Sequence, residues 1–411
     1  MTETALRTDN PVAGAPVART VFVMTVTGLL VVGQMYLVLP LLPAMAQDWH
    51  TTATAATWTA TSFGFAYAAG FLITGPLSDL YGRRRVVVTG LGVLAVATVA
   101  AAFATALPAM IVCRIVQGVG AAGFSPAALA YLSERIPPAR RSLAVTCLVT
   151  AMVAATVTGQ LVAQALAGIA GWRGVFWFNA GFVAVLAFSL RLVMLPDLRR
   201  RSADALGVFF SSTRRLLTRP VLILIYLGAL SVLGVFVAMY TALQLYGPPA
   251  LVGDPGAMLA LRASSLPALV AIPFLASVLD RVRPTLRAAL ALGTGVVTPL
   301  VLGVVGDPPA VMVGGLMFLF VAKIAMVSPG LTELVGQLSG QARGAGVALY
   351  TFALLAGASL GPQLVSALGG HGFTAVLLTI SGVQLAGTAL LLAADRLRPR
   401  AADGRPDRGR R

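Results

Sequence analysis

Residues 75–85 bring together two glycines, one acid and three consecutive arginines at the end of an apolar run. Asp79 and Arg83 are four residues apart, so a helical turn would place both side chains on one face, where they can form an ion pair. Glycines let the backbones of crossing helices approach closely, and an acid can also stabilise a neighbouring helix N-terminus. We therefore predict a gate whose charges pair in one state and separate in another, the alternative being a charged loop that only sets orientation. The gate comprises Gly75, Asp79, Gly82, Arg83 and Arg84.

Two basic residues stand inside apolar runs rather than between them: Arg114 within residues 109–131 and Lys323 within residues 309–328. A charge inside a membrane span costs at least ~2.5–3.5 kcal/mol on insertion scales and usually faces a cavity or a partner. A cavity with two cations and no central acid would attract anionic or carboxylate-bearing molecules. The alternative for Lys323 is that its side chain reaches the inner interface, because it lies about two turns from the predicted helix end.

Polar side chains on the same apolar runs are candidates for a site that includes these two cations. Each of them alone is more often a helix-packing hydrogen bond than a ligand contact. We expect the substrate-binding or coupling residues to be Gln34, Tyr36, Arg114, Gln117, Tyr240 and Lys323. Further candidates on these runs are Gln160, Gln164, Gln244 and Tyr350.

The positions of the acidic residues weaken the case for proton coupling. None of the 14 acids lies at the centre of a predicted span; Asp48 and Asp79 lie at helix ends, and Glu333 lies near an inner end. His50 and His371 fall in predicted outer loops and make poor replacements. The sequence therefore shows no buried carboxylate that would carry a proton.

The composition requires membrane helices to position these residues. Of 411 residues, 58% are hydrophobic and 11% are charged, whereas soluble domains are about 25% charged. A helix needs ~20 residues to cross a bilayer. Apolar runs separated by turn residues and charges predict an all-α polytopic membrane protein with twelve spans. They are residues 20–46, 56–77, 86–106, 109–131, 143–168, 174–195, 221–246, 257–279, 286–306, 309–328, 344–367 and 373–394.

The net charge of +16, from 30 basic and 14 acidic residues, indicates membrane topology rather than a polyanion partner. Arginines concentrate in alternate segments between the spans, as loops facing the cytoplasm require, and the predicted outer loops hold only Arg173 and Arg262. Lys323 is the one lysine, a bias towards arginine that suggests a GC-rich bacterial genome. We expect a multi-pass protein of a bacterial cytoplasmic membrane, with both termini in the cytoplasm and no nucleic-acid partner.

A long linker near the middle divides the chain into two parts. At nearly the same offset, Arg140 aligns with Arg343 and Gly159 aligns with Gly361. Such internal similarity is typical of transporters built from two repeats. We predict two pseudo-symmetric six-helix halves, residues 20–195 and 221–394, joined by a cytoplasmic linker at 196–220 and flanked by cytoplasmic tails at 1–19 and 395–411.

Residues 75–84 resemble a signature of the major facilitator superfamily, G-x-L-x-D-x-x-G-R-R. Further resemblances to the superfamily lie in the fourth span, in the loop after it and at the entry to the sixth span, at residues 114–118, 134–141 and 172–179. Residues 280–283 resemble a decayed second copy of the first signature. The resemblance covers nearly the whole chain and implies the major facilitator fold, in which spans four and ten line the central cavity. Within the superfamily, the chain looks most like the twelve-helix drug:proton antiporters.

Two positions depart from the antiporter pattern. Span five has Gly159-Gln160 where relatives carry Gly-Pro followed by paired glycines, whereas Gly361-Pro362 stands in span eleven. Gln34 occupies a place in span one where relatives often carry an acid. Both departures weaken the expectation of drug export by proton exchange.

We expect a secondary active transporter that exports a small organic molecule, a drug or a metabolite, by alternating access. The resemblance implies protons as the exchanged ion. The alternative is an anion or metabolite facilitator that uses Arg114 and Lys323 as counter-charges without proton coupling. An integral-membrane enzyme or a receptor is disfavoured, because the acids and histidines are scattered and the loops are short. We expect no cofactor and no metal, and a monomer that contacts its substrate and the lipid bilayer.

Overall fold

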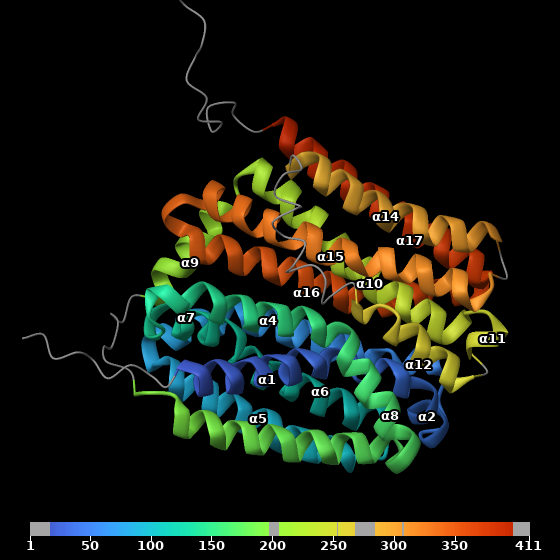
Figure 1. The fold of residues 1–411 in the computed structure, drawn as a ribbon, viewed down its shortest axis with the longest axis horizontal. Helices are drawn as coiled ribbons and strands as arrows, with labels where there is room; N and C mark the ends of the chain where they lie inside the picture. Colours follow the sequence, from blue (N-terminus) through green and yellow to red (C-terminus); the bar gives the residue numbers. More distant parts are fainter. Residues whose placement is uncertain (1–16, 197–204, 253, 268–283, 306–307, 398–411) are drawn as a thin grey trace, which may run out of the picture.

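The computed structural model describes residues 17–196, 205–252, 254–267, 284–305 and 308–397. This part of the chain forms a bundle of long helices that lie side by side (Figure 1) and contains no strand. Six of its helical segments are long and apolar enough to cross a membrane by length and composition. The all-α membrane fold is therefore confirmed. The number of twelve spans stays a prediction, because the eighth span enters residues 268–283, which lie outside the described part.

Other predicted features also lie outside the described residues. They are most of the N-terminal tail, part of the linker, the possible second copy of the charged signature and most of the C-terminal tail, at residues 1–16, 197–204, 280–283 and 398–411.

The first group of helices, residues 17–193, is drawn blue to green in Figure 1. Apolar faces hold these helices together: α1 lies mainly against α8, and α5 lies against both α6 and α8. The members are α1 Val17–Tyr36, η1 Leu39–Leu41, α2 Leu42–Asp48, α3 Ala53–Ala56, α4 Trp58–Tyr81, α5 Arg83–Ala102, α6 Leu107–Ala122, α7 Ser125–Arg135 and α8 Pro138–Val193.

The second group, residues 220–396, is drawn yellow-green to red. Here α10 lies against α16 and α17, and α14 lies against α15 and α17. The members are α10 Pro220–Tyr246, α11 Pro249–Val252, α12 Pro255–Ala263, α14 Pro284–Val305, α15 Ala310–Ser339, η2 Gly340–Ala342, α16 Arg343–Leu368, η3 Gly369–His371 and α17 Gly372–Arg396.

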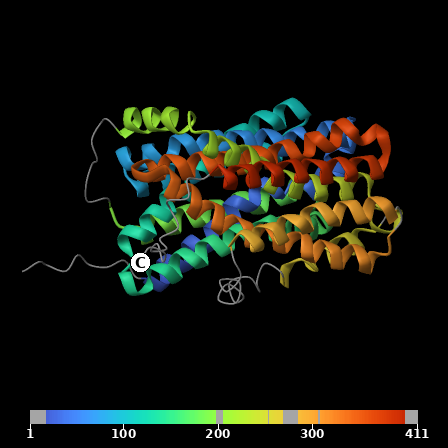
Figure 2. The same ribbon diagram turned by 90° about the horizontal axis from the view of Figure 1, so that it is seen from above.

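The bundle has two ends, which we name after residues of the first group. The Trp49 end carries α2, α11 and α12, on the right of Figure 1. The Asp79 end carries α7 and α9 (Ala205–Leu216), on the left. The view turned by 90° again places α9, in yellow-green, at this end (Figure 2). This helix lies inside the predicted linker and contacts both α4 and α16.

Several predicted spans are interrupted or longer than expected. The first span breaks after Tyr36 into η1 and α2, where Pro40 lies in the first turn of η1. The fourth span breaks between α6 and α7, at Gly123 and Phe124. The helix that contains the tenth predicted span, α15, continues beyond residue 328 to Ser339.

Two close helix crossings occupy corresponding places in the two groups. A Cβ atom added at Gly159 of α8 would lie 2.8 Å from the carbonyl oxygen of Gly33 on α1. A Cβ added at Gly361 of α16 would lie 2.6 Å from the carbonyl oxygen of Gly234 on α10. Gly159 and Gly361 are the glycines that the internal alignment pairs, so this correspondence supports the proposed duplication.

Candidate functional site

The charged signature forms a three-residue ion-pair cluster at the Asp79 end. Arg83 begins α5, and its Nη2 lies 2.7 Å from Asp79 Oδ1 in the last turn of α4. The same nitrogen lies 2.8 Å from Glu134 Oε1 in the last turn of α7. The guanidinium is buried, whereas the two carboxylates remain partly exposed. The predicted Asp79–Arg83 pairing therefore lies in a cluster that joins α4, α5 and α7.

The other signature residues have different positions. Gly82 separates α4 from α5 with φ +96°, a backbone conformation that favours glycine. A Cβ added at Gly75 would meet no described atom within 4 Å, so the close approach expected there is not present in this structure. Arg84 donates from Nη2 to the carbonyl oxygen of Arg191, at 2.5 Å, and so ties α5 to the end of α8.

Arg114 is fully buried on α6, with 0% of its surface exposed. Its Nε donates to the carbonyl oxygen of Thr59 at 3.0 Å, and its Nη2 donates to the carbonyl oxygen of Gln34 at 2.7 Å. Its Nη1 donates to Gln117 Oε1 at 2.9 Å, and the guanidinium carbon lies 4.2 Å from the ring centroid of Phe63. Gln34 lies in the last turn of α1, where carbonyls lack helical partners, so Arg114 fastens α6 to α1 and α4.

Gln34 and Gln117 belong to the same polar network as Arg114. Gln34 Nε2 donates to Asn179 Oδ1 on α8 at 2.9 Å, and Gln117 Nε2 donates to Thr98 Oγ1 on α5 at 2.9 Å. The side-chain oxygen of Gln34 is buried and has no hydrogen-bond partner among the described residues. The structure therefore brings three of the predicted residues together, within the first group of helices. Asn179 was visible in the sequence only as part of the entry to the sixth span.

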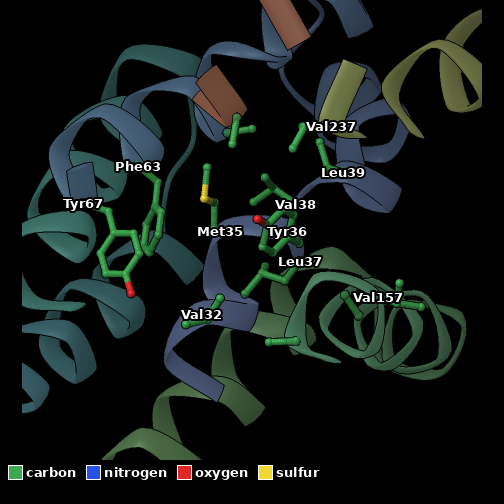
Figure 3. Packing of buried hydrophobic residues seen from close by; sticks show 14 of the residues in the cluster. Val32, Met35, Tyr36, Leu37, Val38, Leu39, Phe63, Tyr67, Val157 and Val237 are labelled. Atoms are coloured by element: carbon green, nitrogen blue, oxygen red, sulfur yellow. The ribbon is translucent and has the colours of Figure 1, made fainter. Parts of the chain in front are cut away.

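Tyr36 and Tyr240 approach each other from the two groups. The ring of Phe236 lies 6.3 Å from that of Tyr36 and 5.1 Å from that of Tyr240, measured between centroids. Figure 3 shows Tyr36 in the apolar packing around Leu39 and Val237, where α1 and η1 meet α10. Tyr240 also donates its hydroxyl hydrogen to Ser265 Oγ at 3.1 Å. These tyrosines lie in an apolar contact between the groups.

Lys323 lies apart from this network, in the second group. Its Nζ donates to Gln384 Oε1 on α17 at 2.6 Å and lies 4.1 Å from the ring centroid of Phe320. The side chain is 1% exposed. Because α15 continues to Ser339, Lys323 is about 24 Å from that helix end, beyond the reach of a lysine side chain. In this structure the Lys323 side chain therefore contacts Gln384 and does not reach the end of its helix, and its alternative role at the inner interface stays a prediction.

Arg262 on α12 is a further buried cation, and the prediction that it lies in an outer loop is wrong. Arg262 is 1% exposed and donates to three glutamine oxygens. Its acceptors are Gln160 and Gln164 on α8, the first at 3.3 Å, and Gln244 on α10 at 2.5 Å. Its position inside the eighth predicted span was the signal that could have identified it. Arg262 joins the second group to the first.

Further hydrogen bonds join the groups at the Trp49 end, and we call their residues Thr57, Thr61, Ser359 and Gln363 the Trp49-end latch. Thr61 donates its hydroxyl hydrogen to the carbonyl oxygen of Ser359 at 2.8 Å. Gln363 Nε2 donates to the hydroxyl oxygens of Thr57 and Thr61 at 3.1 and 3.0 Å. The latch connects α16 with the start of α4, and no pattern in the sequence indicated it.

The long apolar helices of this bundle define the class of multi-pass membrane proteins. A family model of the Major Facilitator Superfamily matches residues 24–362, and the chain belongs to this superfamily. Its members are transporters, so family membership confirms the expectation that the chain is not an enzyme.

Similar curated proteins include drug exporters. The chain is 29% identical over 174 residues to the tetracenomycin C resistance and export protein of Streptomyces glaucescens, covering 41% of this chain and 32% of that protein. It is 27% identical over 170 residues to the multidrug export protein EmrB of Escherichia coli, covering 41% and 33%. It is 28% identical over 242 residues to the MFS-type transporter YybF of Bacillus subtilis, covering 57% and 59%. The matches thus span about a third to three fifths of these relatives.

Proposed function

We propose that the protein exports a small amphipathic organic molecule across a bacterial cytoplasmic membrane in exchange for protons. The drug-export relatives support export. The observation that carries the proposal is the concentration of hydrogen bonds between the two helix groups at the Trp49 end. Alternating access requires such contacts to form and break as one half rocks against the other. Opening of the Trp49 end would release substrate outside.

The arginine distribution supports the proposed orientation. Arg83, Arg84 and Arg135 lie at the Asp79 end, as do Arg219 and Arg343. The positive-inside rule places this end in the cytoplasm, together with both termini. A cysteine added at either terminus should react with a membrane-impermeant maleimide only in inside-out vesicles. Labelling in right-side-out vesicles would contradict the orientation.

Transport can be tested in proteoliposomes that contain a pH-sensitive dye. Ethidium, tetracenomycin C and carboxyfluorescein supply a cation, an aromatic drug and an anion, and each is offered with and without an imposed pH gradient. We expect a gradient to drive substrate against its concentration difference, and added substrate to move protons. Flux of a substrate without any proton movement would contradict proton exchange.

An anion or metabolite facilitator is a second candidate, supported by three of the buried cations, Arg114, Arg262 and Lys323. None of the described ion pairs involves Arg114, Arg262 or Lys323. Their observed acceptors are neutral oxygens, and charged acceptors form stronger hydrogen bonds. This candidate predicts that carboxyfluorescein moves without protons and that Lys323→Gln weakens its binding while sparing neutral compounds. Equal loss for both kinds of compound would contradict it.

A further inference from the structure

Lys323 is the one lysine in a chain with 30 basic residues. The other buried cations of the described residues, Arg83, Arg114 and Arg262, are arginines. The distinction matters chemically, because an ammonium group can release a proton and remain as a neutral amine, whereas a guanidinium keeps its proton in proteins. Lys323 is therefore the buried cation whose charge can change during a transport cycle.

Lys323 lies near the middle of the bundle. It is about 20 Å from the start of α15 at Ala310 and about 24 Å from its end at Ser339. Its acceptor Gln384 is near the middle of α17. A Cβ added at Gly295, near the middle of α14, would lie 2.6 Å from Lys323 Nζ. Three helices thus place the amine at the depth where secondary transporters hold substrates and coupling ions.

The contacts of Lys323 suit both protonation states. Gln384 Oε1 can accept a hydrogen bond from an ammonium or from an amine, and Gln384 is held in turn by Ser231 Oγ, 3.4 Å from its Nε2. A carboxylate in the place of Gln384 would favour the charged form, but the acceptor is neutral. The aromatic face of Phe320 stabilises the ammonium without fixing the proton.

Charged groups on the surrounding helices lie towards the helix ends. Asp395 and Arg396 of α17 are about 16 Å or more along the helix from Gln384, and Glu333 of α15 is about 15 Å from Lys323. The side chain of Arg287 on α14 is not described. The remaining titratable groups on the packed helices α10, α12 and α16 are Tyr226, Tyr240, Tyr246, Arg262, Arg343 and Tyr350.

We propose that Lys323 carries the proton exchanged for substrate, an inference that rests on the proposed proton exchange. When the bundle opens to one side of the membrane and water reaches Lys323, the Nζ–H bond breaks and the proton passes to water. The electron pair stays on Nζ, which Gln384 still holds. A proton from water on the opposite side restores the ammonium. A cationic substrate is repelled by the ammonium, so its binding favours release of the proton. Lys323 therefore replaces the buried carboxylate that the sequence lacks.

Transport by Lys323→Arg tests the proposal against a role as a fixed counter-charge. In proteoliposomes loaded with a pH dye, we expect ethidium-driven proton movement in this variant to fall about tenfold or more, and ethidium exchange to fall with it, because the guanidinium keeps the charge that repels the cation. Lys323→Met, which has no charge at this position, should also lose proton movement but should still bind ethidium and exchange it for labelled ethidium. Arg140→Lys, a change on an exposed arginine, is the matched control. Proton movement at the wild-type rate in Lys323→Arg would overturn the proposal.

A spectroscopic test uses the wild-type protein and does not depend on the fold of a variant. Because the chain has one lysine, labelling with 15N-lysine gives a single side-chain signal, which Lys323→Arg or Lys323→Met would remove. We expect the signal to change from ammonium to amine across the pH range of transport and to shift towards amine when ethidium is added. A signal that stays ammonium throughout would overturn the assignment. If the wild-type protein moves no protons with any substrate, the proposed function fails instead.

Discussion

Arg114, Arg262 and Lys323 show three ways in which this protein accommodates a buried cation. Arg114 uses backbone carbonyls at a helix end, Arg262 uses glutamines from both helix groups, and Lys323 uses one amide and one aromatic ring. Buried charges need such partners, because an unpaired charge in a low-dielectric interior costs several kcal/mol. The partners differ in kind, so we expect the three residues to respond differently to substitution.

Replacing Arg114 should mainly reduce stability. Arg114→Met would leave the carbonyl oxygens of Gln34 and Thr59 without this donor, and we expect a loss of about 2–4 kcal/mol in unfolding free energy. The midpoint of thermal denaturation in detergent measures the loss, with Arg140→Met at an exposed arginine as a control that should change little. A stable Arg114→Met protein that selectively loses anionic substrates would instead favour the facilitator.

Replacing Glu134 tests the ion-pair cluster as a gate. Glu134→Ala removes one of the two carboxylates that hold Arg83 and leaves Asp79. We expect the transport rate to fall about threefold to tenfold, while stability changes by less than about 1 kcal/mol because Glu134 is partly exposed. Initial uptake rates and thermal midpoints measure the two effects. An unchanged transport rate would indicate that the cluster only sets orientation.

At the residue level, the sequence predicted the Asp79–Arg83 proximity, because that contact is local and follows from helix geometry. It could not predict that Gln34 and Arg114 meet, since their contact depends on where α1 ends. The roles of these residues in transport stay predictions.

The close crossings of α1 with α8 and of α10 with α16 depend on glycine pairs. This contact explains why span five has a glycine at position 159: a small residue meets the backbone of α1, at Gly33. Periodicity and composition located most helices, but not the end of α15 at Ser339 or the linker helix α9. Both features continue beyond the apolar runs, where hydropathy gives no signal.

Gly159→Ala and Gly75→Ala form a matched pair that tests the crossing. At Gly159 the added methyl group would lie 2.9 Å from the Cα of Gly33, so α1 and α8 must separate, and we expect a loss of about 1–3 kcal/mol. At Gly75 the methyl group meets no described atom within 4 Å. Stability should therefore stay constant or rise slightly, because alanine favours helix. The thermal midpoints of the two variants measure these effects, and equal effects would contradict a close crossing of α1 and α8 at Gly159.

The transport rate of Gly75→Ala tests whether helices approach Gly75 closely in another conformation. If the rate falls although stability is kept, the close helix approach expected at Gly75 forms in another conformation of the gate.

At the scale of the whole molecule, the Trp49-end latch and Arg262 hold the two helix groups together at one end. Alternating access requires these contacts to break once in each cycle. The composition and the arginine pattern predicted a membrane bundle. They could not predict which residues of the two groups meet, because that depends on long-range packing between segments about 300 residues apart.

Cross-linking the latch should stop transport. In a chain whose Cys113 and Cys147 are replaced by serine, we expect Thr57→Cys with Gln363→Cys to reduce uptake to less than about a tenth when a short thiol cross-linker is added. Each single cysteine variant with the same reagent is the control, and cleavage of a reducible cross-linker should restore uptake. Full transport in the cross-linked protein would show that this end does not open.

Helix α9 is the element that we expect to couple movements of the helix bundle to the surrounding lipid. It contacts both α4 and α16 at the Asp79 end and exposes Val208 and Phe210, with Arg214 and Arg215 in its last turn. Such a helix lies at the level of lipid headgroups, with apolar side chains among acyl chains and arginines near phosphates. If α4 and α16 move apart during transport, we expect α9 to shift within that layer. The speed of the cycle should therefore depend on the headgroup charge and the lateral packing of the lipids.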